Sequence, residues 1–158
     1  MPCPAIPKEL ILSTKLDKGC IHYFDAVAND PFNGCIEKAR PYMIISRLNY
    51  RSNRVIMSPI SDIKNYSENG KLKYPYHAEL LKSEYNFLDK DSVLLLDQVI
   101  TVQKIHLWEE WFIGQITNFK DIDMAIYYNY DLFESINDVF NDFVKQLQQN
   151  HLSKYARR

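Results

Sequence analysis

The chain has 158 residues, of which 46% are hydrophobic and 25% charged, and its formal net charge is −1. This length is enough for one domain with its own hydrophobic core, and the composition excludes a disordered chain. Because the total charge is close to zero, binding to nucleic acid would require a local basic patch.

The three cysteines, Cys3, Cys20 and Cys35, form no CxxC pair, and their odd number does not fit a complete disulfide framework. Such cysteines are typical of reduced thiols in a cytoplasmic protein. No apolar run reaches the roughly 18 residues that a membrane-spanning helix needs. No HExxH motif or Cys/His cluster indicates a metal site. We therefore expect a cytoplasmic protein with no membrane segment, no metal and no cofactor.

The N-terminal residues 1–17, with prolines at positions 2, 4 and 7, are predicted to form an arm, and residues 18–158 a single domain. Cys20 to Val27 has the alternation of a strand, and a loop follows it. The apolar runs Tyr42–Ile45 and Arg54–Met57 flank a polar turn, which predicts a β-hairpin.

Further strands are predicted at residues 72–80, 92–96 and 111–116, so that five or more short strands favour a small barrel or a compact curved sheet. Apolar residues then recur at helical spacing, which predicts a C-terminal helix over about 131–150. Asp131 and Glu134 are spaced as its capping box. We expect this helix to pack on the barrel, although its apolar stripe could instead serve a partner.

Basic residues gather in the predicted hairpin, with no acidic residue among them and with Tyr42 and Tyr50 interleaved. They are Lys38, Arg40, Arg47, Arg51 and Arg54. Attraction to phosphate combined with aromatic stacking is how proteins hold single-stranded RNA. The alternative is a hairpin whose exposed face is basic without binding anything.

Arg40 begins a predicted strand, and Ser61 follows the end of another, in a turn that also contains Asp62. A guanidinium presents a planar donor fork that suits a phosphate. In RNA the 2′-hydroxyl is the nucleophile, so an arginine held against a hydroxyl is sufficient for cleavage without metal. Each residue also has an ordinary interpretation: an arginine at a strand end, and a serine that bonds nearby backbone donors.

Two histidines in predicted strands, His22 and His77, allow another scheme in which two imidazoles share the general acid and base roles. A single histidine in a strand is more often structural, so we give this scheme less weight.

Several segments from about Lys18 to Ile116 resemble, in the same order, the MazF/PemK family of toxin endoribonucleases. The segments are Lys18–Ile21, Lys38–Ser46, Ser58–Ser61, Tyr74–Leu80 and Leu88–Val99, followed by Gly114. The resemblance implies an α+β, mainly β fold, which is an SH3-like small barrel with a C-terminal helix. It also implies a homodimer that cleaves single-stranded RNA at short sequences without metal, leaving a cyclic phosphate and a 5′-hydroxyl.

The resemblance assigns catalytic roles to Arg40 and Ser61, and it places His106 where the family usually has an arginine. Candidate RNA-binding residues are Lys38, Tyr42, Arg51, Arg54, Asp62, His77 and Gln98. The implied partner is a cognate antitoxin whose flexible, acidic-hydrophobic segment folds as it binds.

A function of another class stays open, because one fold can host unrelated tasks. The barrel could be a non-catalytic module that binds RNA or protein, including a toxin that poisons a topoisomerase. In that case Trp108, Trp111 and the C-terminal helix would matter most. The pairing of Arg40 with Ser61 distinguishes the two functions, since a binding module has no need of both.

Overall fold

The computed structural model describes residues 14–24, 40–107 and 111–155. Most of the predicted arm, the loop before Lys38, Lys38 itself and Trp108 therefore lie outside the described residues. The strands are β1 Cys20–Phe24, β2 Arg40–Ile44, β3 Arg54–Asp62, β4 Ser67–Glu68, β5 Lys71–Leu72, β6 His77–Leu80, β7 Ser92–Leu95, β8 Ile100–Gln103 and β9 Phe112–Gln115. The helices are the short η2 Thr14–Leu16, η3 Ile63–Asn65 and η4 Lys104–His106, then α2 Lys120–Asn129 and α3 Phe133–Tyr155.

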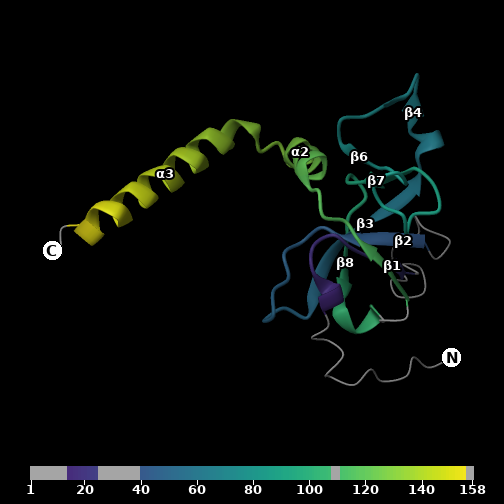
Figure 1. The fold of residues 1–158 in the computed structure, drawn as a ribbon, viewed down its shortest axis with the longest axis horizontal. Helices are drawn as coiled ribbons and strands as arrows, with labels where there is room; N and C mark the ends of the chain where they lie inside the picture. Colours follow the sequence, from purple (N-terminus) through teal and green to yellow (C-terminus); the bar gives the residue numbers. More distant parts are fainter. Residues whose placement is uncertain (1–13, 25–39, 108–110, 156–158) are drawn as a thin grey trace.

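The main sheet follows the order β6-β7-β3-β2-β1-β9, and all of its pairs are antiparallel. Strand β3 organises it, because one edge pairs with β2 while the other pairs first with β8 and then with β7. The sheet curls around this long strand into a half-barrel (Figure 1). The predicted mainly β, α+β fold with a curled barrel sheet is confirmed.

Two apolar clusters stabilise the sheet. One contains Tyr42, Ile44 and Met57, and the other contains Met43, Ile60 and Leu94. Neighbouring residues of one strand divide between the two clusters because successive side chains point to opposite faces. Strand β2 is therefore buried on both sides, which accounts for its continuous apolar run.

Gly19 connects η2 to β1 in a conformation that only glycine tolerates well. Its φ is +91°, and a Cβ at this position would lie 2.3 Å from the Ile116 carbonyl oxygen. The close approach lets Gly19 donate its N–H to Ile44 O at 2.8 Å and accept from Ile116 N at 2.9 Å. The turn thus ties the start of β1 to the ends of β2 and β9.

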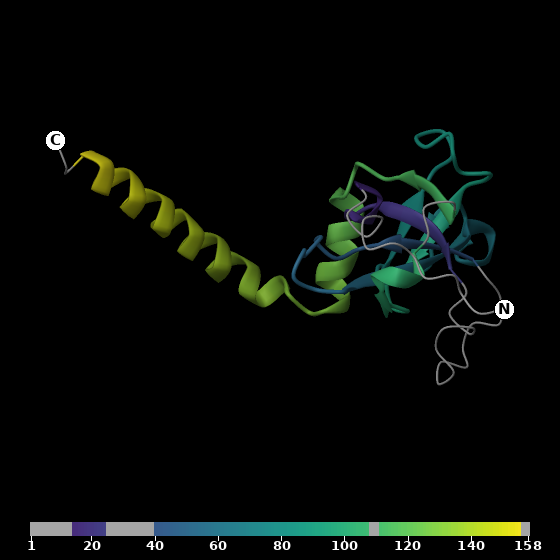
Figure 2. The same ribbon diagram turned by 90° about the horizontal axis from the view of Figure 1, so that it is seen from below.

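The helices differ in how they meet the sheet. Helix α2 buries Ile122 and Ala125 in the second apolar cluster. Helix α3 instead runs away from the strands in both views (Figures 1 and 2), and its apolar residues Phe140 and Phe143 are exposed. The expectation that the C-terminal helix packs on the barrel is wrong for α3. No helix in the described part of the chain is long and apolar enough to cross a membrane.

Several predicted boundaries are corrected. The predicted strand at 72–80 is two strands, β5 and β6, separated by residues 73–76. Strand β8 and helix α2 were not predicted. The expected capping box is also wrong, because Asp131 has φ +53° and lies two residues before α3 begins at Phe133.

Candidate functional site

Arg40 and Ser61 lie at the same end of neighbouring antiparallel strands. The β2–β3 register pairs Tyr42 with Pro59, and two residues further along each strand stand Arg40 and Ser61. Opposed residues share a face of the sheet, and so do residues two apart on a strand. Both side chains are therefore directed to the same face of the sheet.

Ser61 lies inside β3 and not in a turn after it, which corrects the sequence-based boundary. The strand continues because Ile60, Ser61 and Asp62 pair with Leu94, Val93 and Ser92 of β7. Its backbone is thus held on a rigid element, which suits a group that must be positioned accurately.

The two side chains have donors available. Arg40 and Ser61 are both partly exposed, and neither side chain hydrogen-bonds to another residue within the described ranges. By contrast Ser58, three residues earlier on β3, is buried and donates to Leu95 O at 2.6 Å. Arg40 and Ser61 can therefore donate to an external acceptor such as a phosphate oxygen.

Asp62 has a structural role beside this pair. Its carboxylate accepts from Lys64 N at 3.0 Å as the N-cap of η3, and from Lys90 Nζ at 2.8 Å. The hydrogen bond from Lys90, followed by that from Lys64, lowers the pKa of Asp62. The predicted RNA contact of Asp62 is therefore unfavourable, because an ionised carboxylate repels phosphate. The Lys90 cation that it holds lies at the same end of β3, on the face of the strand opposite to Ser61.

His77 lies at the centre of an aromatic cluster. Its side chain is 2% exposed, its Nε2 is 3.0 Å from Asp97 Oδ1, and its ring meets three tyrosine rings edge-on, those of Tyr66, Tyr74 and Tyr76. Burial keeps this imidazole from direct contact with RNA, which corrects the sequence-based assignment. His77 instead supports the rings around it.

Tyr74 and Tyr76 stack on each other with centroids 5.1 Å apart and planes 14° apart, and Tyr128 of α2 stacks beyond Tyr76 at 6.4 Å. Burial, with the nearby Tyr74 and Asp97, raises the pKa of Tyr76. Tyr74 is 44% exposed, so one end of this stack presents an open ring.

The remaining predicted residues are spread over the molecule. Tyr42 is fully buried, so it offers no ring face for stacking, and its predicted RNA contact is wrong for this reason. Arg51 and Arg54 are exposed at the hairpin turn. Arg54 is seven residues before Ser61 on β3, which corresponds to a distance of about 23 Å along the strand. Gln98 is exposed in the turn after β7, and Lys38 lies outside the described residues.

His22 does not support the two-histidine scheme. It is 1% exposed, and its Nε2 lies 2.7 Å from the Lys15 carbonyl oxygen. Since His77 is also buried, both imidazoles that the scheme requires lie inside the protein. His106, in η4, is partly exposed.

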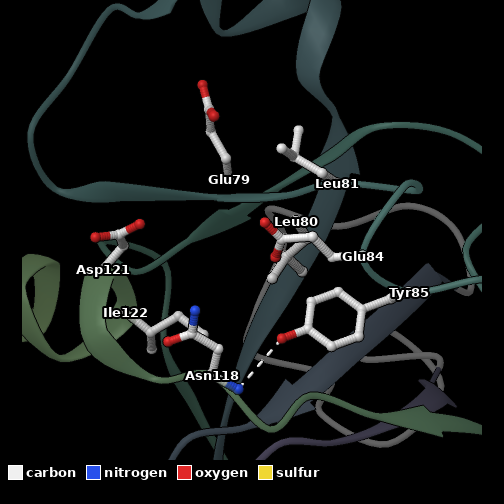
Figure 3. Close-up of a pocket in the computed structure, with 8 residues that line it drawn as sticks. All are labelled: Glu79, Leu80, Leu81, Glu84, Tyr85, Asn118, Asp121 and Ile122. Atoms are coloured by element: carbon white, nitrogen blue, oxygen red, sulfur yellow. Dashed lines mark hydrogen bonds between the residues drawn. The ribbon is translucent and has the colours of Figure 1, made fainter.

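A small pocket of about 70 Å³ lies between β6, the segment after it and the start of α2 (Figure 3). Three of the residues that line it are acidic: Glu79, Glu84 and Asp121. Two of its lining residues are joined, because Tyr85 Oη accepts a hydrogen bond from Asn118 N at 3.2 Å. Its negative charge makes this pocket a poor site for RNA phosphates. No cluster that could hold a metal occurs among the residues that the structure describes.

The sequence suggested no role for Lys90, Lys64 or the exposed Tyr74, which the structure adds as candidates. Lys90 stands between Asp89 and Asp91 in the sequence, so the local charge is negative and gives no sign of a basic site. Only the pairing of β3 with β7 brings it to Asp62.

Comparison with known proteins gives a consistent result. The family described as PemK-like, MazF-like toxin of type II toxin-antitoxin system matches residues 21–127. The endoribonuclease MazF of Staphylococcus saprophyticus is 38% identical over 89 residues, covering 55% of this chain and 69% of that protein. The Staphylococcus epidermidis protein of the same name is 37% identical over the same shares.

Two solved structures share the fold. An endoribonuclease in complex with its cognate antitoxin, from a mycobacterial species, has a TM-score of 0.54 at 17% identity, covering 73% of this chain and 95% of that chain. The Mycobacterium tuberculosis toxin MazF-mt6 has a TM-score of 0.50 at 21% identity, covering 71% and 96%. The family match runs from β1 into α2 and includes both Arg40 and Ser61, and this chain belongs to the PemK-like, MazF-like family of type II toxin–antitoxin toxins.

Proposed function

We propose that this chain is a toxin endoribonuclease that cleaves single-stranded RNA without a metal ion. The observation that carries the proposal is the placement of Arg40 and Ser61 at one end of β2 and β3, on a shared face. Both have donors unused by the other described residues. The staphylococcal relatives named as endoribonucleases support the same activity.

In the proposed reaction the RNA supplies its own nucleophile. The 2′-oxygen attacks the adjacent phosphorus as its proton leaves, the bond to the 5′-oxygen breaks, and that oxygen takes up a proton. The products are a 2′,3′-cyclic phosphate and a 5′-hydroxyl. The Arg40 guanidinium stabilises the charge that develops on the phosphoryl oxygens, and the Ser61 hydroxyl donates a further hydrogen bond to the phosphate.

RNA binding in this proposal also uses exposed cations and one exposed aromatic ring outside that pair. Lys90, which is 61% exposed at its side chain, and Lys64 supply positive charge at Asp62, which lies at the same end of β3 as Ser61 but on the opposite face of the strand. Tyr74 offers its open ring to a base, in the role that the sequence had suggested for Tyr42. Arg51 and Arg54 extend the basic surface along the hairpin to its turn.

The partners in this proposal are a cytoplasmic RNA, a second copy of the barrel and a cognate antitoxin. The related mycobacterial structure, which contains an endoribonuclease with its cognate antitoxin, supports the last of these. A flexible segment with acidic and hydrophobic residues would neutralise the cations at Arg40 and Lys90 as it folds, and would thereby block the RNA.

The experiment incubates the purified protein with a long single-stranded RNA in EDTA and compares wild type with Arg40→Ala. Wild type should give discrete fragments with 5′-hydroxyl and cyclic-phosphate ends. Arg40→Ala should cleave about 10²- to 10³-fold more slowly, the loss typical of a donor that stabilises a developing oxyanion. Lys120→Ala is the matched control, because it removes an exposed cation at the start of α2.

Intact RNA with both wild type and Arg40→Ala, from protein that is folded and otherwise stable, would contradict the nuclease. It would favour the non-catalytic barrel instead. Cleavage that disappears in EDTA and returns with added magnesium would contradict the metal-free reaction.

A further inference from the structure

Helix α3 carries an apolar seam with the spacing of a coiled coil. Phe133, Ile136, Phe140, Phe143 and Leu147 follow one another at intervals of three, four, three and four residues. This is the a/d pattern with which one helix packs along another. The helix lies outside residues 21–127, the family match, so the family domain does not account for it.

The seam faces solvent in the single chain. Phe140 is 64% exposed, Phe143 55% and Leu147 52%, and Figures 1 and 2 show the helix projecting away from the strands. A helix of 23 residues draws most of its stability from the packing of its apolar face. Such a helix therefore needs an occupant for this seam.

We propose that the occupant is a second copy of this chain, which pairs through α3. The residues that flank the seam are Asn137, Val139, Val144 and Gln146, and none is charged. In coiled coils, charges at these flanking positions select a different partner or repel an identical one. Here nothing along the seam opposes self-pairing, and no charge calls for a complementary helix.

Charged residues lie on the far side of the helix. Asp138, Asp142 and Lys145 project away from the seam, and Lys145 lies 3.5 Å from Asp142 within the same helix. Two copies packed seam to seam therefore keep these charges in water.

The available area also favours a second copy. Three phenylalanines, an isoleucine, a leucine and the adjacent valines would bury on the order of 500 Å² per chain, and two copies about 1,000 Å², the lower limit of a specific interface. A partner helix without apolar residues would contribute no apolar area of its own, so about half of this apolar area would not be buried. The proposed contact is separate from the barrel dimer, and it does not depend on RNA cleavage.

The test places the photocrosslinker p-benzoyl-phenylalanine in the full chain at position 140, where it replaces a phenylalanine. Protein labelled with heavy nitrogen is mixed with unlabelled protein, so mass spectrometry can distinguish links between copies. We expect light–heavy products in which position 140 joins an α3 peptide of the other copy. The same crosslinker at position 149, on the opposite face, should give few such products.

A second measurement compares Phe140→Asp with Gln149→Asp by sedimentation of the full chain and by far-UV circular dichroism. Phe140→Asp should weaken association of copies at least about tenfold and lower helical content, whereas the added charge at position 149 should change neither. The absence of links between copies at position 140, or equal effects of the two substitutions, would overturn the proposal. Arg40→Ala should crosslink like wild type. The pairing of α3 can therefore be tested even if the protein does not cleave RNA.

Discussion

Ser58 and Ser61 stand three residues apart on β3 and therefore point to opposite faces of the strand. Ser58 is fully buried and donates to the Leu95 carbonyl, which secures β3 to β7. Ser61 is partly exposed beside Arg40. The two hydroxyls thus separate a structural role from the proposed catalytic one within a single strand.

Ser61→Ala should lower the rate of RNA cleavage about 10²-fold or more, because it removes a donor to the phosphate, while the free energy of unfolding should change little. Ser61→Thr should retain most of the rate, since the hydroxyl remains. Cleavage of a fluorogenic RNA oligonucleotide by purified variants measures both. An Ala variant as fast as wild type would remove Ser61 from the mechanism.

The matched control for this result is Ser58→Ala. It should lower the free energy of unfolding by about 1–3 kcal/mol, because the buried Leu95 carbonyl loses its donor. The cleavage rate per folded molecule should stay unchanged.

Asp62 should make stability depend on pH in the acid range. Because its pKa is lowered in the folded protein, its stabilising effect is present above the usual value of 3.8 and is lost as the pH falls through the lowered pKa. The melting temperature of wild type should therefore fall more steeply below about pH 4 than that of Asp62→Asn. Asparagine still caps η3 but carries no charge.

Lys90→Ala tests the cause of this effect. Since the Lys90 hydrogen bond is the largest cause of the lowered pKa, its removal should flatten the acid dependence toward that of Asp62→Asn. Parallel melting curves for wild type and Asp62→Asn between pH 5 and pH 2.5 would contradict the prediction.

At the scale of elements, the sequence predicted those strands whose apolar residues are continuous. Strands β2 and β7 are buried on both faces, and both were found at nearly their observed bounds. Strand β8 was missed because only Val102 of its four residues is buried. Helix α2 was missed because it buries only Ile122 and Ala125, too few for a clear helical period.

In the candidate site, too, features with a local sequence pattern were predicted and features without one were missed. Arg40 and Ser61 could be proposed from the sequence because they lie beside recognisable apolar runs and within segments that resemble the family. Lys90 reaches Asp62 only through the pairing of β3 with β7, across 28 residues of sequence. The fully buried Tyr42 was misassigned, since alternation alone does not show that both faces of β2 are covered.

The contact between β9 and the segment before β7 leads to a prediction about packing. A Cβ on Gly114 would lie 2.5 Å from the Phe87 ring, so Gly114→Ala should lower the free energy of unfolding by about 1–3 kcal/mol. Chemical denaturation measures this loss. In the Gly114→Ala, Phe87→Leu double variant the combined loss should be smaller than the sum of the single losses.

Gly70→Ala serves as the comparison, because Gly70 has φ +74° but no atom within 4 Å of the added methyl group. Its cost should reflect backbone conformation alone, about 1–2 kcal/mol, and Phe87→Leu should leave it unchanged. Additive losses for Gly114 and Phe87 would show that the ring moves aside freely.

On the scale of the whole molecule, basic and acidic residues gather in different segments of the chain. The basic hairpin runs from Arg40 at one end of β2 to the turn with Arg51 and Arg54, whereas Asp121 and Asp123 give α2 an acidic start. Asp123 is partly neutralised by Lys18 at 2.6 Å. The hairpin therefore offers favourable potential to an RNA strand that is cleaved beside Ser61.

This geometry predicts that the length of the RNA decides how much the distant arginines matter. Arg54 lies about 23 Å along β3 from Ser61, so a strand of about four nucleotides cut at Ser61 would end short of it, whereas one of about 16 would span the hairpin. Arg51→Ala with Arg54→Ala should raise KM for the long RNA about tenfold or more and reduce its salt dependence, with kcat nearly unchanged. For the short RNA neither constant should change.

Steady-state cleavage of both substrates at two salt concentrations measures this. Equal losses on both RNAs would mean that these arginines act on the barrel itself, and no loss on either would mean that the RNA leaves Ser61 in another direction.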